Sequence, residues 1–234
     1  MGSGSHLKRL AMPRSWALPR KISTWVTRPR SGAHSLEYCM SISTVIRDVL
    51  GFADTAREVR RILHEGKALI DGRVVRDARR GVGLMDVLTL GDENYRCVLD
   101  KNGKLRYQKI PPDDADWKVC RIEGKSTIKG GRTQLNLHDG RNILVDDAVE
   151  FNTGDSVKIQ LPDQAILTHL PFEDGAQAYL IGGSHVATIA NIKEHHVKRS
   201  SMPNEVLFDD FGTISRHVII VGDDTPLPKA EVAL

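Results

Sequence analysis

The sequence predicts an α+β fold, mostly β, in which a small helical module precedes a long β-rich region. Apolar residues recur at helical spacing only between residues 42 and 63. From Tyr95 onward, short apolar strands alternate with turn residues instead. The first 32 residues carry seven basic side chains and no acidic one. We therefore predict a basic extension (1–36), a helix–helix–hairpin module (37–92), a β-rich central domain (93–171), a small SH3-like barrel (172–222) and a flexible tail (223–234).

The charge of the chain is concentrated in the extension. The whole chain has a net charge of +3, whereas residues 1–32 carry +7 and the remainder −4. A basic segment on a nearly neutral body indicates an acidic partner, usually nucleic acid, because basic side chains release counterions when they bind phosphates. The alternative is that the segment is a targeting peptide or a cloning remnant. Residues 1–5 resemble a linker left by cloning, but the residues from His6 onward do not. The candidate RNA contacts here are Lys8, Arg9, Arg14, Arg20, Lys21, Arg28 and Arg30.

Two tryptophans, Trp16 and Trp25, lie among these basic residues. Aromatic and basic side chains together favour base stacking combined with neutralisation of the backbone. The same tryptophans could equally pin the extension onto its own protein. Pro13, Pro19 and Pro29 prevent one long helix, so we expect an extension that is irregular alone and becomes ordered on its partner.

Two short helices are predicted next. Ile42, Val45, Ile46, Val49 and Leu50 follow the spacing of one buried helical face, and Gly51 suits the left-handed position that ends a helix. A second helix begins at Thr55, with Glu58 completing a capping box. The apolar side of this helix is formed by Ala56, Val59, Ile62 and Leu63.

The second helix also carries a basic stripe opposite its apolar side. Arg57, Arg60, Arg61 and His64 share one face, with no acidic residue among them. Such a stripe is often only a solvated surface, but without internal ion pairs it is suited to holding phosphates. Asp71-Gly72 then predicts a tight hairpin turn. The positive surface continues through Arg73, Arg76, Arg79 and Arg80, before Gly81 and Gly83, which we expect to break the chain.

The rest of the chain predicts short strands. We expect Tyr95–Leu99 to pair with Lys104–Lys109, and residues 133–137 to turn at Asp139-Gly140 into 142–145. With strands at 156–160 and 165–168, this region predicts one small barrel or sandwich. Beyond Phe172 we expect five short strands, with a loop over residues 195–204.

No chemical site is recognisable. The three cysteines, Cys39, Cys97 and Cys120, are too scattered for a disulfide framework or a thiolate zinc site. His195 and His196 are adjacent, so on a strand they point to opposite faces. Asp113, Asp114 and Asp116 lack the glycine of a calcium loop, and Gly124-Lys125-Ser126 lacks the upstream glycine of a phosphate-binding loop. We expect no catalysis, cofactor, metal, small-molecule substrate or membrane segment, and a soluble intracellular protein.

Several stretches together resemble a known family. They are His6-Leu7-Lys8-Arg9 with Pro13 and Trp16, Glu58-Val59, Ile70-Asp71-Gly72-Arg73-Val74, Leu84-Met85-Asp86-Val87, Lys118-Val119-Cys120-Arg121-Ile122 and Leu137-His138-Asp139-Gly140-Arg141. In this order, over nearly the whole chain, they resemble the archaeal and eukaryotic small-subunit ribosomal protein family S-four-e. The resemblance implies a cytoplasmic, non-catalytic protein that binds ribosomal RNA beside other small-subunit proteins.

The resemblance also implies a helix–helix–hairpin RNA-binding module and a C-terminal KOW-type barrel. It carries RNA contact over to Lys8, Arg9, Arg57, Arg60, Arg61, Arg73 and Arg76. The chain departs from the KOW motif at Ala187, Thr188 and Ala190, where the motif has a glycine and a basic residue, and this puts RNA contact by that loop in doubt. We expect the barrel to form nevertheless, because alanine is tolerated wherever φ is negative.

Two other functions fit the same modules. One is a free RNA-binding regulator, and the other is a factor associated with RNA modification. A ribosomal component would be stoichiometric on subunits and stay bound at moderate salt, whereas a regulator would be substoichiometric and wash off.

Overall fold

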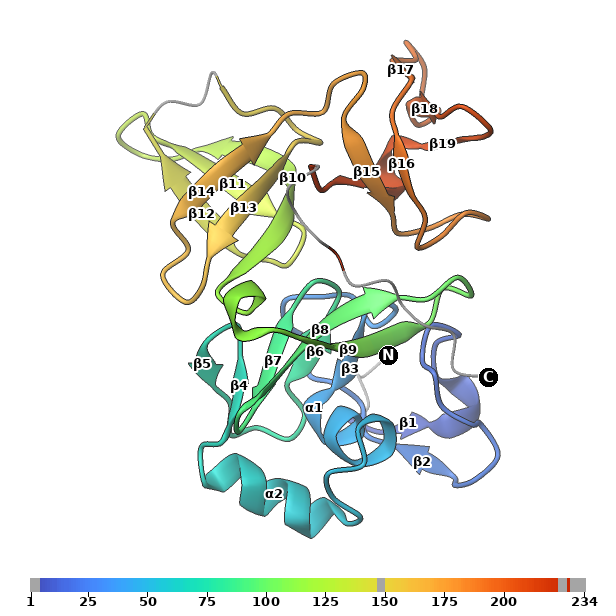
Figure 1. Ribbon diagram of the computed structural model, residues 1–234, viewed down its shortest axis with the longest axis vertical. Coiled ribbons are helices and arrows are strands. Elements are labelled where there is room, and N and C mark those ends of the chain that lie inside the picture. The colour runs from blue at the N-terminus through green and yellow to red at the C-terminus, as the bar shows by residue number, and fades with distance from the viewer. Residues whose placement is uncertain (1–4, 147–149, 223–226, 228–234) are drawn as a thin grey trace. The chain divides into compact units, whose positions relative to one another are not determined.

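The computed structural model of the protein describes residues 5–146, 150–222 and 227, and it forms two compact units (Figure 1). The first unit comprises the chain up to Val98 together with Lys104–Asp116, and the second comprises Leu99–Gly103 and the chain from Trp117. Strands far outnumber helices in both units, as predicted. Among the described residues, no helix has the length and apolar character needed to cross a membrane.

A five-stranded sheet forms the first unit's centre, in the order β5-β4-β7-β8-β9. Its strands are β4 (Ala68–Ile70), β5 (Arg73–Val74), β7 (Val87–Leu90), β8 (Glu93–Leu99) and β9 (Leu105–Ile110). Asp71 and Gly72 have φ of 50° and 73°, which confirms the predicted tight turn between β4 and β5. The boundary predicted between residues 92 and 93 lies inside this sheet, because Leu90 pairs with Glu93. A short 3-10 helix, Pro112–Asp114, follows β9.

Both predicted helices are present in the first unit. The first begins as α1 (Ile42–Thr44) and continues as a π-helical turn over Val45–Val49, with Gly51 left-handed at φ 71°. The second is α2 (Ala56–His64), and its predicted capping box between Thr55 and Glu58 is formed. Val59 and Leu63 are buried, whereas Ala56 is exposed and does not belong to the apolar side.

We expected Gly81 and Gly83 to break the chain, and this prediction is wrong. They lie in β6 (Gly81–Gly83), which pairs with β3 (Cys39–Ser41). A Cβ atom on Gly83 would lie 2.3 Å from the ring of His34. Glycine is therefore required at residue 83 for close approach of a side chain to the backbone, rather than for a turn.

The extension is folded onto the first unit, so the expectation that it is ordered only by a partner is wrong. β1 (Leu7–Lys8) pairs with β2 (Trp25–Val26), with a 3-10 turn over Arg9–Ala11. Trp16 is only 2% exposed and its indole nitrogen donates to the carbonyl of Leu36 at 3.2 Å. It also forms an isolated bridge with Leu105 of β9. The alternative that a tryptophan pins the extension to its own protein is thus confirmed for Trp16.

A second five-stranded sheet belongs to the second unit and curls into a half-barrel, in the order β12-β11-β10-β13-β14 (Figure 1). The strands are β10 (Trp117–Thr127), β11 (Thr133–Leu137), β12 (Asn142–Val145), β13 (Ser156–Gln160) and β14 (Ile166–Leu170). The long strand β10 pairs with β13 through its first half and with β11 through its second, with an irregularity between Ile122 and Gly124. The core contains Cys120, Ile122, Leu135, Leu137, Phe151, Val157 and Ile159.

The C-terminal region contains two three-stranded sheets, in the orders β16-β15-β20 and β17-β18-β19. Their strands are β15 (Gln177–Leu180), β16 (Ile189–Asn191), β17 (Glu194–His196), β18 (Glu205–Leu207), β19 (Gly212–Ile214) and β20 (Val218–Ile220). A 3-10 turn, Ser215–His217, precedes β20. The loop expected from His195 is shorter than predicted, because His195 and His196 lie in β17. The predicted tail lies, apart from Leu227, outside the described residues.

Ala187 is left-handed, at φ 64°, so our expectation of a negative φ there is wrong. An L residue in this region costs about 1 kcal/mol or more relative to glycine. We expect Ala187→Gly to raise the free energy of unfolding by about 1 kcal/mol, measured by urea denaturation of the full chain. The matched control is Ala190→Gly in β16, which should lower stability by about 0.5–1 kcal/mol because glycine weakens a strand. Equal effects of the two substitutions would contradict this account.

Candidate nucleic-acid interface

The basic stripe of α2 faces solvent. Arg57, Arg60, Arg61 and His64 are all exposed, and Val59 and Leu63 on the other side are fully buried. Arg61 pairs with Glu65 at 3.3 Å while its side chain remains 83% exposed. Among the described residues, no carboxylate lies within ion-pair distance of Arg57 or Arg60. The packing of α2 therefore leaves its guanidinium groups available to an external partner.

The two glutamates that flank the stripe are engaged elsewhere. Glu58 accepts hydrogen bonds from the backbone amides of Asp54 at 2.8 Å and Thr55 at 3.1 Å. These backbone donors lower the pKa of Glu58, so it stays ionised as part of the helix cap. Glu65 is held chiefly by Lys67, at 2.8 Å, which lowers its pKa. Neither carboxylate neutralises Arg57 or Arg60.

Arg57 does not stabilise its own helix. It is the second residue of α2, where the partial positive charge of the helix N-terminus disfavours a cation. The cost of such a placement is about 0.3–1 kcal/mol at an exposed site. An arginine that weakens its helix and contacts no acid is better explained by an anionic partner.

The basic residues after α2 extend this surface. Arg73 begins β5, and Arg73, Arg76 and Arg80 are exposed. Arg30 of the extension pairs with Asp77 at 3.1 Å, with the Arg30 side chain still 66% exposed. The extension and the segment after the hairpin thus meet in one basic region of the first unit.

Two arginines of the extension hold its fold. Arg9 is 5% exposed; its Nε donates to the carbonyl of Pro19 at 2.6 Å and its Nη1 to Ser23 Oγ at 3.3 Å. Arg20 donates from Nη1 to the carbonyls of Leu10 and Met12, at 2.9 and 2.8 Å. Their guanidinium groups are used inside the extension, so their contribution is mainly structural.

The other cations of the extension are accessible. Lys8, Arg14 and Lys21 are exposed. Trp25 is 54% exposed, and the Lys8 ammonium lies 5.6 Å from the centre of its ring. Unlike Trp16, Trp25 presents an aromatic face beside a cation, the combination that stacks on bases and holds phosphates.

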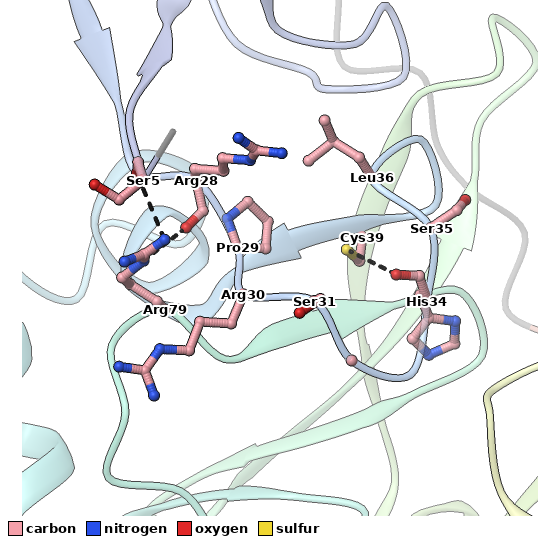
Figure 2. Close-up of a pocket in the computed structure, with 11 residues that line it drawn as sticks. Ser5, Arg28, Pro29, Arg30, Ser31, His34, Ser35, Leu36, Cys39 and Arg79 are labelled. Atoms are coloured by element: carbon pink, nitrogen blue, oxygen red, sulfur yellow. Dashed lines mark hydrogen bonds between the residues drawn. The ribbon is translucent and has the colours of Figure 1, made fainter. Parts of the chain in front are cut away.

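A cavity of about 460 Å³ brings three of the predicted arginines together (Figure 2). Arg28 and Arg30 come from the extension and Arg79 from the segment after the hairpin, so residues far apart in sequence line one hollow. Arg79 is half-buried; its Nε donates to the Arg28 carbonyl at 3.1 Å and its Nη2 to the Ser5 carbonyl at 3.5 Å. This arginine links the extension to the first unit's sheet region.

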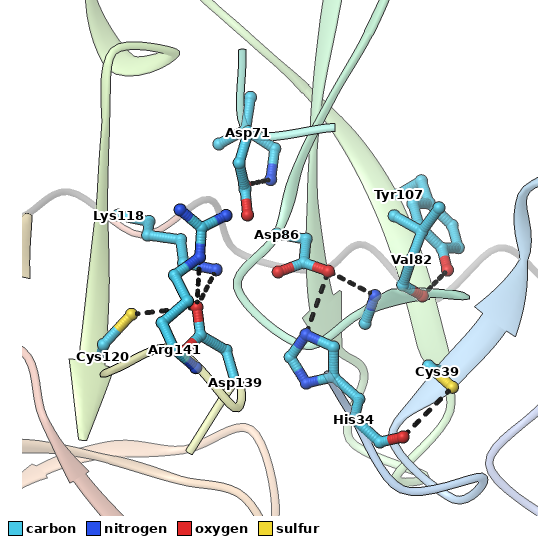
Figure 3. A network of polar contacts seen from close by, with 12 residues as sticks. His34, Cys39, Asp71, Val82, Asp86, Tyr107, Lys118, Cys120, Asp139 and Arg141 are labelled. Carbon is cyan, nitrogen blue, oxygen red and sulfur yellow. Dashed lines mark hydrogen bonds and ion pairs between the residues drawn. The ribbon is translucent and has the colours of Figure 1, made fainter. Parts of the chain in front are cut away.

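The cysteine that lines this cavity is not a nucleophile. Burial, and to a lesser degree the charge of Asp86, raises the pKa of Cys39 to about 11, so it remains a thiol at neutral pH. The nearby His34 is fixed by Asp86, with Nε2 3.0 Å from Oδ2 and both side chains almost fully buried (Figure 3). Asp86 also accepts from the Gly83 amide at 2.8 Å. The histidine and the carboxylate therefore stabilise the turn between β6 and β7.

Sequence reasoning missed a buried ion cluster in the second unit. Lys118 Nζ lies 2.5 Å from Asp139 Oδ2, with side-chain exposures of 0% and 1% (Figure 3). Arg141 Nε lies 3.0 Å from the same oxygen, and Cys120 Sγ donates to it at 3.6 Å. The only sequence signal was a lysine between apolar neighbours on β10, which does not reveal its partner.

Family comparisons identify two regions of the chain. Residues 91–166 match the family described as Ribosomal family S4e, and residues 1–37 match the RS4NT (NUC023) domain. The second match covers the extension that carries Lys8, Trp16 and Trp25.

Full-length relatives agree with these matches. The chain is 43% identical over 242 residues to small ribosomal subunit protein eS4 of Methanocaldococcus jannaschii, covering 97% of this chain and 98% of the relative. It is 41% identical over 232 residues to the protein of the same name from Methanothermobacter thermautotrophicus, covering 96% and 95%.

A solved structure agrees as well. The crystal structure of 30S ribosomal protein S4e from Thermoplasma acidophilum superposes with a TM-score of 0.70 at 33% identity, covering 80% of this chain and 96% of that one. The members of this family are structural components of the ribosome and not enzymes. The chain belongs to the ribosomal protein family S4e.

Proposed function

We propose that this chain is a structural constituent of the small ribosomal subunit that positions ribosomal RNA without catalysing a reaction. The observation that carries the proposal is the solvent-facing stripe of α2, in which Arg57 and Arg60 have no ion-pair partner among the described residues and Arg61 remains 83% exposed. RNA helices are recognised mainly by shape and by contacts to phosphates and 2′-hydroxyls, which exposed guanidinium groups on a rigid helix provide. Its partners are small-subunit ribosomal RNA and neighbouring small-subunit proteins, in the cytoplasm.

The fold supports a rigid form of binding. Because Trp16 joins the extension to β9 and Arg9 holds the extension's own fold, its exposed cations are held in place before RNA arrives. A pre-ordered surface avoids the entropic cost of ordering a flexible arm on binding. The contacts we propose are Lys8, Arg14, Lys21, Arg30, Arg57, Arg60, Arg61, Arg73, Arg76 and Arg80, with Arg28 and Arg79 at the cavity of the extension.

Two parts of the fold have proposed roles of their own. We assign RNA binding to the helix–helix–hairpin module of α1, α2, β4 and β5, within residues 37–92. We assign residues 172–222 to a KOW-type, SH3-like barrel built from β15 to β20. What supports the second assignment is the glycine-like φ of Ala187, at the place where that motif carries glycine.

The extension can be tested by separating its two classes of cation. We expect Lys8, Arg14 and Lys21 replaced together by Gln to reduce the slope of log affinity for small-subunit RNA against log salt by about 2–3, because each phosphate contact contributes about 0.7–0.9. The thermal midpoint should change little, since all three side chains are exposed. The measurement is filter binding between 50 and 200 mM salt, about the range in which such slopes are resolved.

Arg9→Gln is the matched control for the extension. It removes one cation from the same segment, but Arg9 is buried and bonded to Pro19 and Ser23. We expect a stability loss of about 1–3 kcal/mol, as when a buried hydrogen bond to a charged group is lost, and little change in salt slope. An unchanged slope in the triple variant would contradict the proposed role of the extension.

The rival functions make a different prediction. A free RNA-binding regulator or RNA-modification factor would use the same basic surface, but it would not remain on subunits at one copy each. The full-length similarity to small-subunit proteins favours the ribosomal function.

A further inference from the structure

A second cationic cavity lies within the second unit, and none of the basic residues predicted from the sequence as RNA contacts lines it. Its volume is about 340 Å³, at the lower end of the roughly 300–1,000 Å³ of ligand pockets. β10 contributes Arg121 and Glu123, β17 contributes His195, and the 3-10 turn before β20 contributes Arg216. The cavity is therefore formed where the half-barrel meets the C-terminal sheets.

Two buried nitrogen atoms of residues that line this cavity have no hydrogen-bond partner in the described part of the chain. The Arg121 side chain is 10% exposed; its Nη1 donates to the Arg216 carbonyl at 2.8 Å. Its Nε is buried and, within the described part of the chain, has no hydrogen-bond partner. The same is true of His195 Nε2, whose ring packs against Phe172 with centroids 4.9 Å apart. A buried donor without an acceptor costs about 1–3 kcal/mol, so an acceptor from outside would remove this cost.

The cavity is also electropositive. Burial lowers the pKa of Arg121; Glu123 raises it in part, and the nearby charge of Arg216 lowers it further. Burial, then Arg216 and Arg121, likewise lower the pKa of the adjacent His217. Among the described residues that line the cavity, one is acidic: Glu123, which lies 3.5 Å from Arg121 and whose side chain is 48% exposed. An anion would relieve the repulsion between these cations.

We propose that this cavity binds a phosphate group of an RNA backbone, with Arg121 Nε and His195 Nε2 donating to its oxygens and Arg216 supplying charge. Phosphate is the anion that accepts from several donors at once, and arginine matches its geometry. The apolar ring of Phe172 and the side chain of Pro203 line the remainder of the cavity, beside the sugar or base of the same nucleotide. This inference rests on the proposed RNA-binding function and adds to it a second contact surface on the second unit.

The test follows the His195 imidazole by NMR in the full chain. We expect inorganic phosphate to shift the His195 resonances saturably, whereas chloride at equal ionic strength does not. A single-stranded RNA should also shift these resonances and should compete with phosphate for the site. Arg216→Gln should abolish the phosphate response and reduce the salt slope of RNA binding by about 0.7, the value of one phosphate contact. Arg132→Gln is the matched control, because Arg132 is exposed on the same unit and does not line the cavity.

The outcomes separate this inference from the proposed function. No saturable shift with phosphate or RNA overturns the inference, and the proposed function then stands if the extension and α2 variants still weaken RNA binding. A phosphate shift that RNA does not compete with overturns the RNA source and leaves a site for a free phosphate or nucleotide. The inference is supported if phosphate shifts the His195 resonances and RNA competes with it. This response should be lost in Arg216→Gln and kept in Arg132→Gln.

Discussion

Asp139→Ala should lower the free energy of unfolding by about 3–5 kcal/mol, the usual result of removing one partner from a buried ion pair. Asp139 is 1% exposed and its Oδ2 lies 2.5 Å from Lys118 Nζ and 3.0 Å from Arg141 Nε. Without this carboxylate, the buried ammonium of Lys118 loses the anion that lies 2.5 Å from it. The measurement is urea denaturation of the full chain, followed by the fluorescence of its tryptophans.

Two further variants show whether charge is the cause. Asp163→Ala makes the same change at an exposed site of the second unit, and we expect a shift within about 0.5 kcal/mol. Combining Lys118→Met with Asp139→Leu removes both buried charges, and we expect it to restore much of the loss because a buried pair and apolar side chains of similar size often have similar stability. A loss below about 1 kcal/mol in Asp139→Ala would sink the assignment of a stabilising ion cluster.

Replacing Arg57, Arg60 and Arg61 together by Gln should weaken the affinity for small-subunit RNA about a hundredfold near physiological salt, at roughly 1 kcal/mol for each phosphate contact. The salt slope should fall by about 2–3. Stability should hardly change, because the loss of the Arg61–Glu65 pair is offset by removal of Arg57 from the positive end of α2. Filter binding and a thermal melt on the same preparations provide both numbers.

A matched triple variant distinguishes α2 from bulk charge. Lys101, Lys129 and Arg132 are exposed cations of the second unit, and replacing them by Gln removes the same total charge. We expect this variant to lose much less affinity than the α2 variant. Equal losses would show a general electrostatic attraction, and a large fall in the thermal midpoint of the α2 variant would show that those arginines are structural.

The elements predicted well from the sequence are those determined by neighbouring residues. The capping box of α2 depends on Thr55 and Glu58, and the hairpin turn on Asp71 and Gly72, so each carries its own signal. The folded extension could not be predicted in the same way. Trp16 is held by Leu36 and Leu105, and the second of these is far away in sequence.

The strands that sequence reasoning missed also depend on distant pairing. Gly81 and Gly83 are of a residue type that is typical of a break between strands, yet their backbone pairs with Ser41 and Cys39. The length of β10 follows from its two partners, β11 and β13, which pair with different halves of it. Pairing of this kind leaves no trace in local composition.

The sequence predicted which basic residues could belong to the candidate site. It did not predict which of them face solvent and which hold the fold. Arg9 and Arg57 look alike in sequence, since both are cations in basic segments. The structure separates them, because Arg9 donates to the backbone carbonyl of Pro19. Every residue has a backbone carbonyl, so the sequence does not show which one Arg9 will bind. Arg121 was noted only within a family motif, because its buried position depends on the fold of the second unit.

The central claim is that the chain is a permanent component of the small subunit, and sucrose-gradient sedimentation of a cell lysate tests it most directly. The protein is quantified per small subunit before and after a moderate-salt wash. The account predicts about one copy per small subunit, the stoichiometry of a specific site, retained after the wash. A signal confined to the light fractions would contradict it and favour a free RNA-binding regulator or an RNA-modification factor.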